Sequence, residues 1–271
     1  MLKNTGNNIF EDVTFSTNLI DTSWSGDASV IDANNDGYPD IYITNMQGND
    51  EYFENLKGEK FIRKSSELFS KTPWGSMGIK VFDFDNDGQQ EIFITDMHSD
   101  MVSNDNLIGK DEKGKFPLKV PESFLKTDGK SIFGNAFYKK NKEGGFLEIS
   151  EQVNGEISWP WGLSVGDLNA DGFEDVFITA SMNYPFRYQK NSLLLNEHGN
   201  KFLDSEFVLG VEPRRDGRYA KKWFELDCDG LDKTHKHCKG KSGKQTIYGA
   251  CLLYTSPSPR DATLSRMPSS A

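Results

Sequence analysis

The stretch DANNDGYPDIYIT, from Asp32 to Thr44, decides the fold, because acidic and amide side chains alternate in it ahead of one glycine. The same arrangement returns twice: DFDNDGQQEIFIT begins at Asp83 and DLNADGFEDVFIT begins at Asp167. Each copy follows a tryptophan and a run of small and apolar residues, and each ends in a β-branched and aromatic segment. One pattern that recurs in this way predicts a repeat architecture.

The three copies have the composition of calcium-binding loops. Ca²⁺ takes about six to eight oxygen ligands from carboxylates, amides and backbone carbonyls. The order D-x-[DN]-x-D-G directs positions 1, 3 and 5 toward one centre, and glycine at position 6 permits the turn that brings in the carbonyl of position 7. An EF-hand would need a Glu at position 12, but Ile43, Ile94 and Ile178 stand there. The closing acid is at position 9, which predicts a short loop between two strands.

The predicted calcium ligands are the side chains at positions 1, 3, 5 and 9 and the carbonyl at position 7 of each loop. They are Asp32, Asn34, Asp36, Tyr38 and Asp40; Asp83, Asp85, Asp87, Gln89 and Glu91; and Asp167, Asn169, Asp171, Phe173 and Asp175. A single loop of this kind could be an Asx-rich turn, but three copies in register favour the metal. So many clustered carboxylates would repel one another without a cation.

Each repeat also predicts four β-strands. The segments after the loops are short, β-branched and aromatic, and a second shared pattern, which starts near Asn49, Asn135 and Asn191, contains a glycine turn between two further strands. Four strands per repeat is the composition of a propeller blade. We therefore expect an all-β chain that forms a partial β-propeller of about three blades over residues 1–250, with a polar insertion at about 99–134 in the second.

These loops and strands resemble the FG-GAP/VCBS repeat family, which is shared with the heads of integrin α-chains. The segments IFEDVT, PWGSMG, TDMHSDM and WFELDCDGLDKTHKHCKG are similar to its cartilage-acidic-protein-like branch. The resemblance covers residues from about Ile9 to Ala250. It implies a seven-bladed, usually exported propeller that binds Ca²⁺ within its blades and serves adhesion or extracellular recognition.

The amino-acid composition narrows the classes of partner that this chain could bind. The chain has 41 acidic and 31 basic residues, a formal net charge of −10, and this acidity argues against a nucleic-acid partner. No apolar stretch is long enough to span a membrane, and the first residues do not form an export signal. With the resemblance, we expect a secreted, periplasmic or cell-surface protein whose signal lies outside this sequence.

The two cysteines of the repeat region, Cys228 and Cys238, bracket a polar loop. Their spacing is compatible with a disulfide in an oxidising compartment. Two free thiols, or a zinc site that uses His235 and His237, are the alternatives. The segment DCDGLD, from Asp227, looks like a fourth calcium loop but lacks the closing acid and the following strand, so we interpret it as a disulfide-tied loop.

The last segment, Cys251 to Ala271, abandons every earlier pattern and resembles a translated sequencing-library adapter. We expect this tail to be non-native and disordered, and the natural sequence to break off near Ala250, so that the chain is a fragment. The alternative is a flexible tail rich in serine and proline.

No catalytic motif stands out. The segment GKSGKQT, at Gly240, lacks the spacing of a phosphate-binding loop, and the cluster of Asp96, His98 and Asp100 is more simply a polar loop than an acid–base site. We expect a non-catalytic module that binds an unknown protein or polysaccharide. The alternative is the propeller part of a larger secreted enzyme that acts on or binds a polymer.

Overall fold

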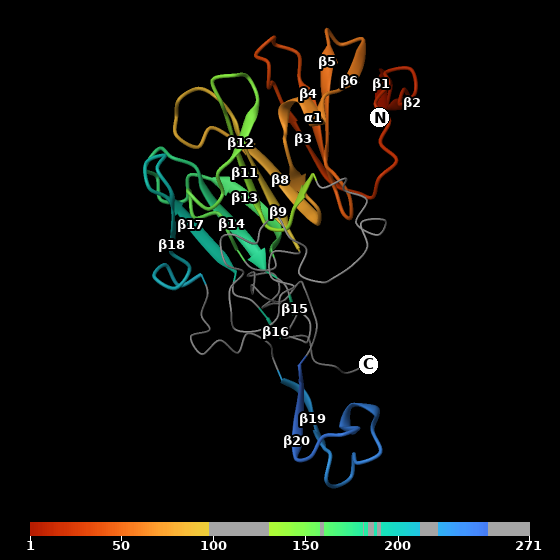
Figure 1. Ribbon diagram of the computed structural model, residues 1–271, viewed down its shortest axis with the longest axis vertical. Helices are drawn as coiled ribbons and strands as arrows, with labels where there is room; N and C mark the ends of the chain where they lie inside the picture. Colours follow the sequence, from red (N-terminus) through yellow and green to blue (C-terminus); the bar gives the residue numbers. More distant parts are fainter. Residues whose placement is uncertain are drawn as a thin grey trace.

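The computed structural model describes residues 1–97, 130–157, 160–180, 182–183, 187–188, 191–211 and 222–248. Three four-stranded antiparallel sheets dominate these residues, and they lie one beside the next in chain order (Figure 1, orange, yellow-green and teal). The prediction of an all-β partial propeller is confirmed. The insertion, apart from its last residues, and the tail from Cys251 onward lie outside the described residues.

Each sheet follows the chain in order, and its strands are joined by loops and turns. The first sheet contains β3 (Ser25–Ile31), β4 (Asp40–Asn45), β5 (Glu51–Leu56) and β6 (Lys60–Arg63). The second contains β8 (Ser76–Phe82), β9 (Glu91–Asp96), β11 (Ala136–Lys140) and β12 (Phe146–Glu148). The third contains β13 (Pro160–Gly166), β14 (Asp175–Ala180), β17 (Ser192–Asn196) and β18 (Phe202–Asp204).

Short elements surround these sheets. They are the hairpin of β1 (Leu2–Gly6) and β2 (Ile9–Asp12), the helix α1 (Ser65–Leu68), the parallel pair β7 (Thr72–Pro73) and β10 (Ser131–Ile132), and the pair β15 (Met182–Asn183) and β16 (Arg187–Tyr188). A separate hairpin, blue in Figure 1, contains β19 (Lys222–Asp227), the short helix η2 (Lys236–Cys238) and β20 (Lys244–Tyr248).

The first strands of the three sheets lie against one another, and glycines permit this approach. An added Cβ at Gly26 would lie 3.2 Å from the carbonyl oxygen of Ser76 in the second sheet. One at Gly78 would lie 3.0 Å from both the carbonyl oxygen of Trp161 and the side chain of Leu163 in the third sheet. Gly26 and Gly78 therefore set the distance between neighbouring blades.

The threonine that ends each I-x-I-T segment stabilises an irregularity in its sheet. The register of the first two strands shifts in every sheet, and one threonine hydroxyl spans each shift. Thr44 accepts from the N–H of Asp27 at 2.9 Å and donates to its carbonyl at 3.0 Å. Thr95 makes the equivalent pair with Gly78 and also donates to the carbonyl of Trp161 at 3.0 Å. The threonine thus satisfies backbone groups that the ladder leaves unpaired.

Aromatic side chains fill the space between neighbouring sheets. Phe69 packs between the first two sheets, with ring centroids 5.1 Å from Tyr42, 5.1 Å from Tyr138 and 4.8 Å from Phe146. A second cluster, between the second and third sheets, is built around Phe84, Phe93, Phe137 and Phe202. Burial of such large rings is the main favourable term that holds one blade to the next.

A buried side chain just before the third strand of each sheet ties down the end of the second strand. Asp50 accepts from the N–H of Asn45 at 2.7 Å, Asn135 from Asp96 at 2.9 Å, and Asn191 from Ala180 at 3.0 Å. Asp50 also accepts from the hydroxyls of Tyr42 and Ser76. Burial raises the pKa of the Asp50 carboxyl well above its ordinary value, and these hydrogen bonds offset only part of the effect.

We predict that Gly78→Ala lowers the free energy of unfolding by about 1–3 kcal/mol, because the new methyl group would press on backbone of the third sheet. The matched control is Gly162→Ala, whose Cβ would meet its nearest neighbour, the Thr179 hydroxyl, at an ordinary 3.5 Å. Urea unfolding of the two variants checks the claim. Equal stabilities would contradict the proposed spacing between blades.

The raised pKa of Asp50 predicts a dependence of stability on pH. The folded protein holds this proton more tightly than the unfolded chain, so the free energy of unfolding falls as pH rises above the ordinary value of 3.8. Asp50→Asn removes this contribution, and asparagine already performs the same capping in the other two sheets. Urea unfolding in EDTA between about pH 4 and pH 8 should therefore give a flatter profile for the variant. The exposed Asp204→Asn is the control and should keep the parent profile.

Candidate metal centre

The three predicted loops join the first and second strands of the three sheets and share one hydrogen-bond pattern. The side chain at position 1 accepts from the N–H groups of positions 5 and 6, at 3.0 and 2.9 Å for Asp32, 3.1 and 2.9 Å for Asp83, and 3.1 and 3.0 Å for Asp167. The carboxylate at position 5 accepts from the N–H of position 7 in each loop, at 2.8, 2.8 and 2.9 Å. The backbone therefore curls around the acidic side chains.

Two left-handed residues produce this curl. Position 6 is glycine in every loop, with φ of 82°, 84° and 89°. Position 4 also has a positive φ, 57° at Asn35, 57° at Asn86 and 62° at Ala170. Asparagine and glycine tolerate this region, whereas alanine carries a steric penalty there. The third loop is thus strained at Ala170 and the other two are not.

The acid at position 9 is the most buried member of each loop. Asp40, Glu91 and Asp175 are all 0% exposed. Asp40 accepts from the N–H groups of Ala33 and Asn55 and from the Tyr52 hydroxyl. Burial raises the pKa of the Asp40 carboxyl, and these hydrogen bonds reduce the shift. A carboxylate kept in such a place without a positive charge nearby is costly, which is a reason to expect a cation beside it.

Asp175 closes the third loop in the same way. Its two oxygens accept from the N–H groups of Leu168 at 2.9 Å and Asn196 at 2.8 Å. Asn55 and Asn196, on the third strands of their sheets, also donate their side-chain amides to the carbonyls of Pro39 and Glu174, which precede the closing acids. The third strand therefore clasps the end of the loop in the first and third sheets.

The second loop differs from the other two because a lysine side chain contacts its acidic residues. Ligand oxygens of Asp83, Asp85 and Glu91 lie within 4.8 Å of one another. The ammonium of Lys139, from β11, contacts Asp85 and lies 3.5 Å from Glu91 Oε1. Burial raises the pKa of Glu91 to about 7, although the N–H of Phe84 and the charge of Lys139 act in the opposite direction. For Lys139, burial acts to lower the pKa, but the carboxylates outweigh it and raise that pKa.

Two buried oxygens in this loop, Asp85 Oδ1 and Glu91 Oε1, have no hydrogen-bond donor. Unsatisfied acceptors of this kind are what a hard cation with oxygen ligands would use. When bound, such a cation supplies positive charge and a set of strong oxygen contacts. In the second loop the oxygens of Asp83, Asp85 and Glu91 converge, and these residues fit the group.

The loops also contact one another from blade to blade. Asn35 of the first loop donates to the Gln89 side chain of the second at 3.1 Å, and Asn86 donates to the carbonyl of Gly172 in the third at 3.0 Å. Gly199, in the turn between β17 and β18, packs on Asp85 so closely that a Cβ there would overlap the Asp85 Cβ. The three loops therefore form one continuous rim.

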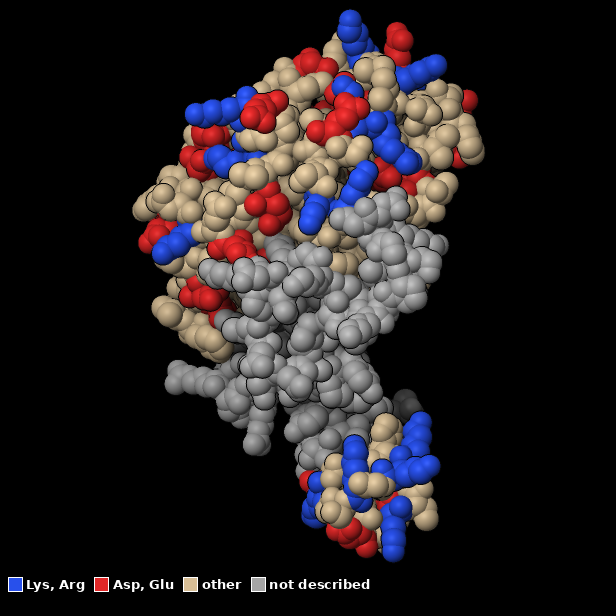
Figure 2. Space-filling view, viewed as in Figure 1, with Lys and Arg blue, Asp and Glu red and all other residues tan. Residues whose placement is uncertain are grey.

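The disulfide-tied segment is not a fourth copy of this site. Cys228 and Cys238 are bonded, with their Cα atoms 5.1 Å apart. Asp229 and Asp232 accept from the N–H groups of Gly243 and Asp227. Figure 2 shows lysine side chains gathered on this hairpin, an unfavourable setting for a cation. Asp96 is buried at the end of β9, whereas His98 and Asp100 of the acid–histidine cluster lie outside the described residues.

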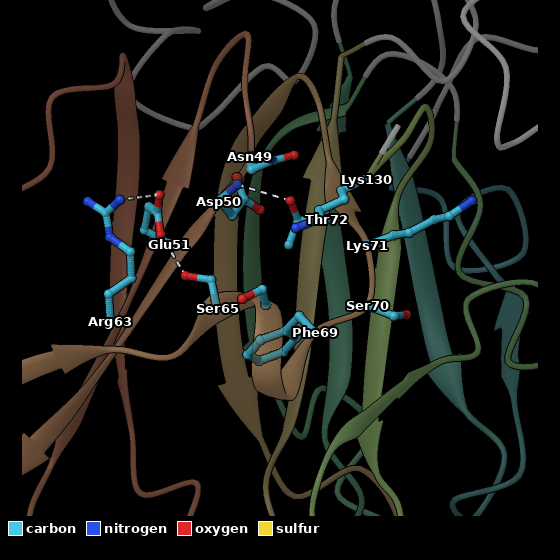
Figure 3. A pocket seen from close by; sticks show the side chains of 11 residues that line it. Asn49, Asp50, Glu51, Arg63, Ser65, Phe69, Ser70, Lys71, Thr72 and Lys130 are labelled. Atoms are coloured by element: carbon cyan, nitrogen blue, oxygen red, sulfur yellow. Dashed lines mark hydrogen bonds and ion pairs between the residues drawn. The ribbon is translucent and has the colours of Figure 1, made fainter. Parts of the chain in front are cut away.

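A pocket of about 190 Å³ lies at the opposite end of the first sheet from its acidic loop. Figure 3 shows Glu51 between Arg63 and Ser65, with Phe69 below them. Glu51 pairs with Arg63 at 3.3 Å and accepts from the Ser65 hydroxyl at 2.6 Å. These polar groups satisfy one another, and the pocket does not extend the loops.

Sequence reasoning did not predict Lys139, Asn55 or Asn196. A signal for the two asparagines exists, because ENL and LNE place Asn at the same point of the first and third repeats while the second has Lys140. Lys139 has no such signal, since it reaches its loop only through the pairing of β11 with β9.

Comparison with known protein families gives matches to segments that contain these loops. Residues 32–94 match a family described as FG-GAP-like repeat, and residues 159–193 match one described as FG-GAP repeat. These two segments of the chain are similar to FG-GAP repeats. No curated protein matches it. None of the helices in the described ranges has the length and apolar character needed to traverse a bilayer.

A solved structure titled as an exotype rhamnogalacturonan lyase, YesX, aligns with 84% of this chain at 14% identity and a TM-score of 0.27. This chain spans 45% of that structure's length. A likeness of this size carries no argument about fold or function.

The strain at position 4 of the third loop predicts that Ala170→Asn raises the free energy of unfolding by about 0.5–1 kcal/mol, because asparagine tolerates a positive φ. The converse variant, Asn86→Ala, should be destabilised, since it gains the strain and loses the bond to Gly172. Thermal unfolding of both variants tests this reading. An Ala170→Asn protein that melts no higher than the parent would contradict it.

Proposed function

We propose that this protein is a calcium-stabilised β-propeller module that presents a rigid surface for extracellular or cell-surface recognition. The observation that carries the proposal is the threefold repetition of one loop, each with a fully buried acid at position 9 and carboxylate or amide oxygens at positions 1, 3 and 5. One Ca²⁺ per loop would neutralise these acids and fix the hairpin formed by the first two strands.

The contacts between loops extend this role to the whole rim. The first loop is bonded to the second, and the second to the third, through the asparagine at position 4, so a cation that orders one loop also restrains its neighbour. Binding to the folded state alone adds directly to stability. The role of the metal in this proposal is structural, and the module itself is non-catalytic.

The Cys228–Cys238 bond supports the extracellular part of the proposal. Disulfides persist in oxidising compartments and are rare in the cytosol. The partner we propose is a protein or a polysaccharide recognised by the rigid propeller surface. Export of the chain and its place in the cartilage-acidic-protein-like branch remain predictions.

Thermal unfolding with Ca²⁺ and with EDTA tests the calcium claim. At a concentration about 100 times the dissociation constant, each filled site adds about 2.7 kcal/mol, so the melting temperature should rise by about 5–10 °C for each filled site. A variant in which Asp36, Asp87 and Asp171 are all replaced by Asn should lose most of this rise. The control is Asp204→Asn, which changes an exposed acid outside the loops and should respond to Ca²⁺ like the parent. The same melting temperature in Ca²⁺ and in EDTA would refute the proposal.

A further inference from the structure

Lys139 occupies the place where the second loop would bind a cation. Its ammonium contacts Asp85, lies 3.4 Å from Asp87 Oδ2 and lies 3.5 Å from Glu91 Oε1. These are the acids at positions 3, 5 and 9 of the loop. Two of them, Asp85 and Glu91, also present buried oxygens without a hydrogen-bond donor. The ammonium therefore supplies positive charge at the point where those oxygens converge.

The first and third sheets have no cation at the equivalent position. The strand registers pair Phe53 with Ile41, Tyr138 with Ile92, and Leu194 with Val176. The residues that correspond to Lys139 are therefore Glu54 and Leu195. Glu54 bonds to Lys64, the residue that follows β6, and Leu195 carries no charge.

The second loop also lacks the clasp that holds the other two. The side-chain amides of Asn55 and Asn196 donate to the carbonyls that precede the closing aspartates, but Lys140 replaces this asparagine in the second sheet. The closing acid there is Glu91, whose side chain is one methylene longer and reaches toward Lys139. The changes occur together: a longer acid, no asparagine and a lysine within contact distance.

An ammonium and a divalent cation cannot share these oxygens, because both need the same lone pairs and they repel each other. We propose that Lys139 is an intramolecular counter-ion that must be displaced before the second loop binds Ca²⁺, so that this loop binds Ca²⁺ more weakly than the first and third. The inference rests on the proposed calcium-binding function. The Lys139 side chain is 30% exposed, which gives the displaced ammonium a path to solvent.

The same arrangement gives the second loop a stabilising charge when calcium is absent. The lysine neutralises part of the repulsion among its acids, whereas the first and third loops have no ammonium in contact with their acids within the described residues. Removal of calcium should therefore loosen the first and third loops before the second.

Calorimetric titration of metal-free protein with Ca²⁺ tests the proposal. The parent should show two tighter sites and one weaker site. Lys139→Met, which keeps the length of the side chain and removes its charge, should tighten the weaker site by about tenfold or more. Lys139→Gln is a second variant with the same expected direction. Lys140→Met, a change at the neighbouring lysine, should leave all three sites unchanged.

Two further measurements separate the outcomes. Asp87→Asn should remove the weaker site in the parent and the tightened site in the Lys139→Met background, which assigns both to the second loop. Lys139→Met should lower the melting temperature in EDTA and increase the rise that Ca²⁺ produces, whereas loss of packing alone would lower the melting temperature in both conditions. Three equal sites in the parent, with no effect of Lys139→Met, would overturn this inference and leave the calcium proposal standing. Absence of binding in every variant would overturn both.

Discussion

A fully buried carboxylate at the start of the second strand of every sheet is the constraint on which the structure depends. Asp40, Glu91 and Asp175 have no exposed surface, and a charge in that position needs partners on all sides. The loop supplies backbone N–H groups from one side, and in two sheets the third strand supplies an N–H from the other. One side chain thus fixes the loop and three strands relative to one another.

The blades are held together by a second set of interactions near the first strands. Glycines at the start of these strands allow the sheets to approach, the threonine hydroxyls satisfy the backbone where the register shifts, and large aromatic rings fill the space farther out. The rim of loops adds bonds from blade to blade at the edge. The buried acids and these contacts act on the same strands, so order in a loop and order between blades are coupled.

Much of this organisation could be predicted from the sequence because it depends on short-range patterns. A β-branched and aromatic strand, a glycine at position 6 and an acid at position 9 are all visible within the thirteen residues that begin at Asp32. The three sheets appear where those patterns place them. Contacts that depend on strand register could not be predicted in this way. Lys139 is 54 residues from Asp85, beyond a long insertion, and meets it only because β11 pairs with β9.

The roles of some residues that recur at the same position of the repeats became clear only from the structure. The threonine of I-x-I-T reads as a β-branched strand residue, yet its hydroxyl bridges a register shift. The Asn of the third strand reads as a turn residue, yet the side-chain amides of Asn55 and Asn196 donate to the carbonyls that precede the buried acids. Ala170 shows the opposite case, because its sequence position predicts a loop but only its φ of 62° reveals strain.

The most direct test of the central claim is a diffraction experiment on crystals of this protein grown with Ca²⁺. The account predicts an anomalous peak within bonding distance of the oxygens of Asp32, Asn34, Asp36 and Asp40, and another in the third loop. Loops that keep their backbone hydrogen bonds and show only water at those positions, at saturating Ca²⁺, would contradict it.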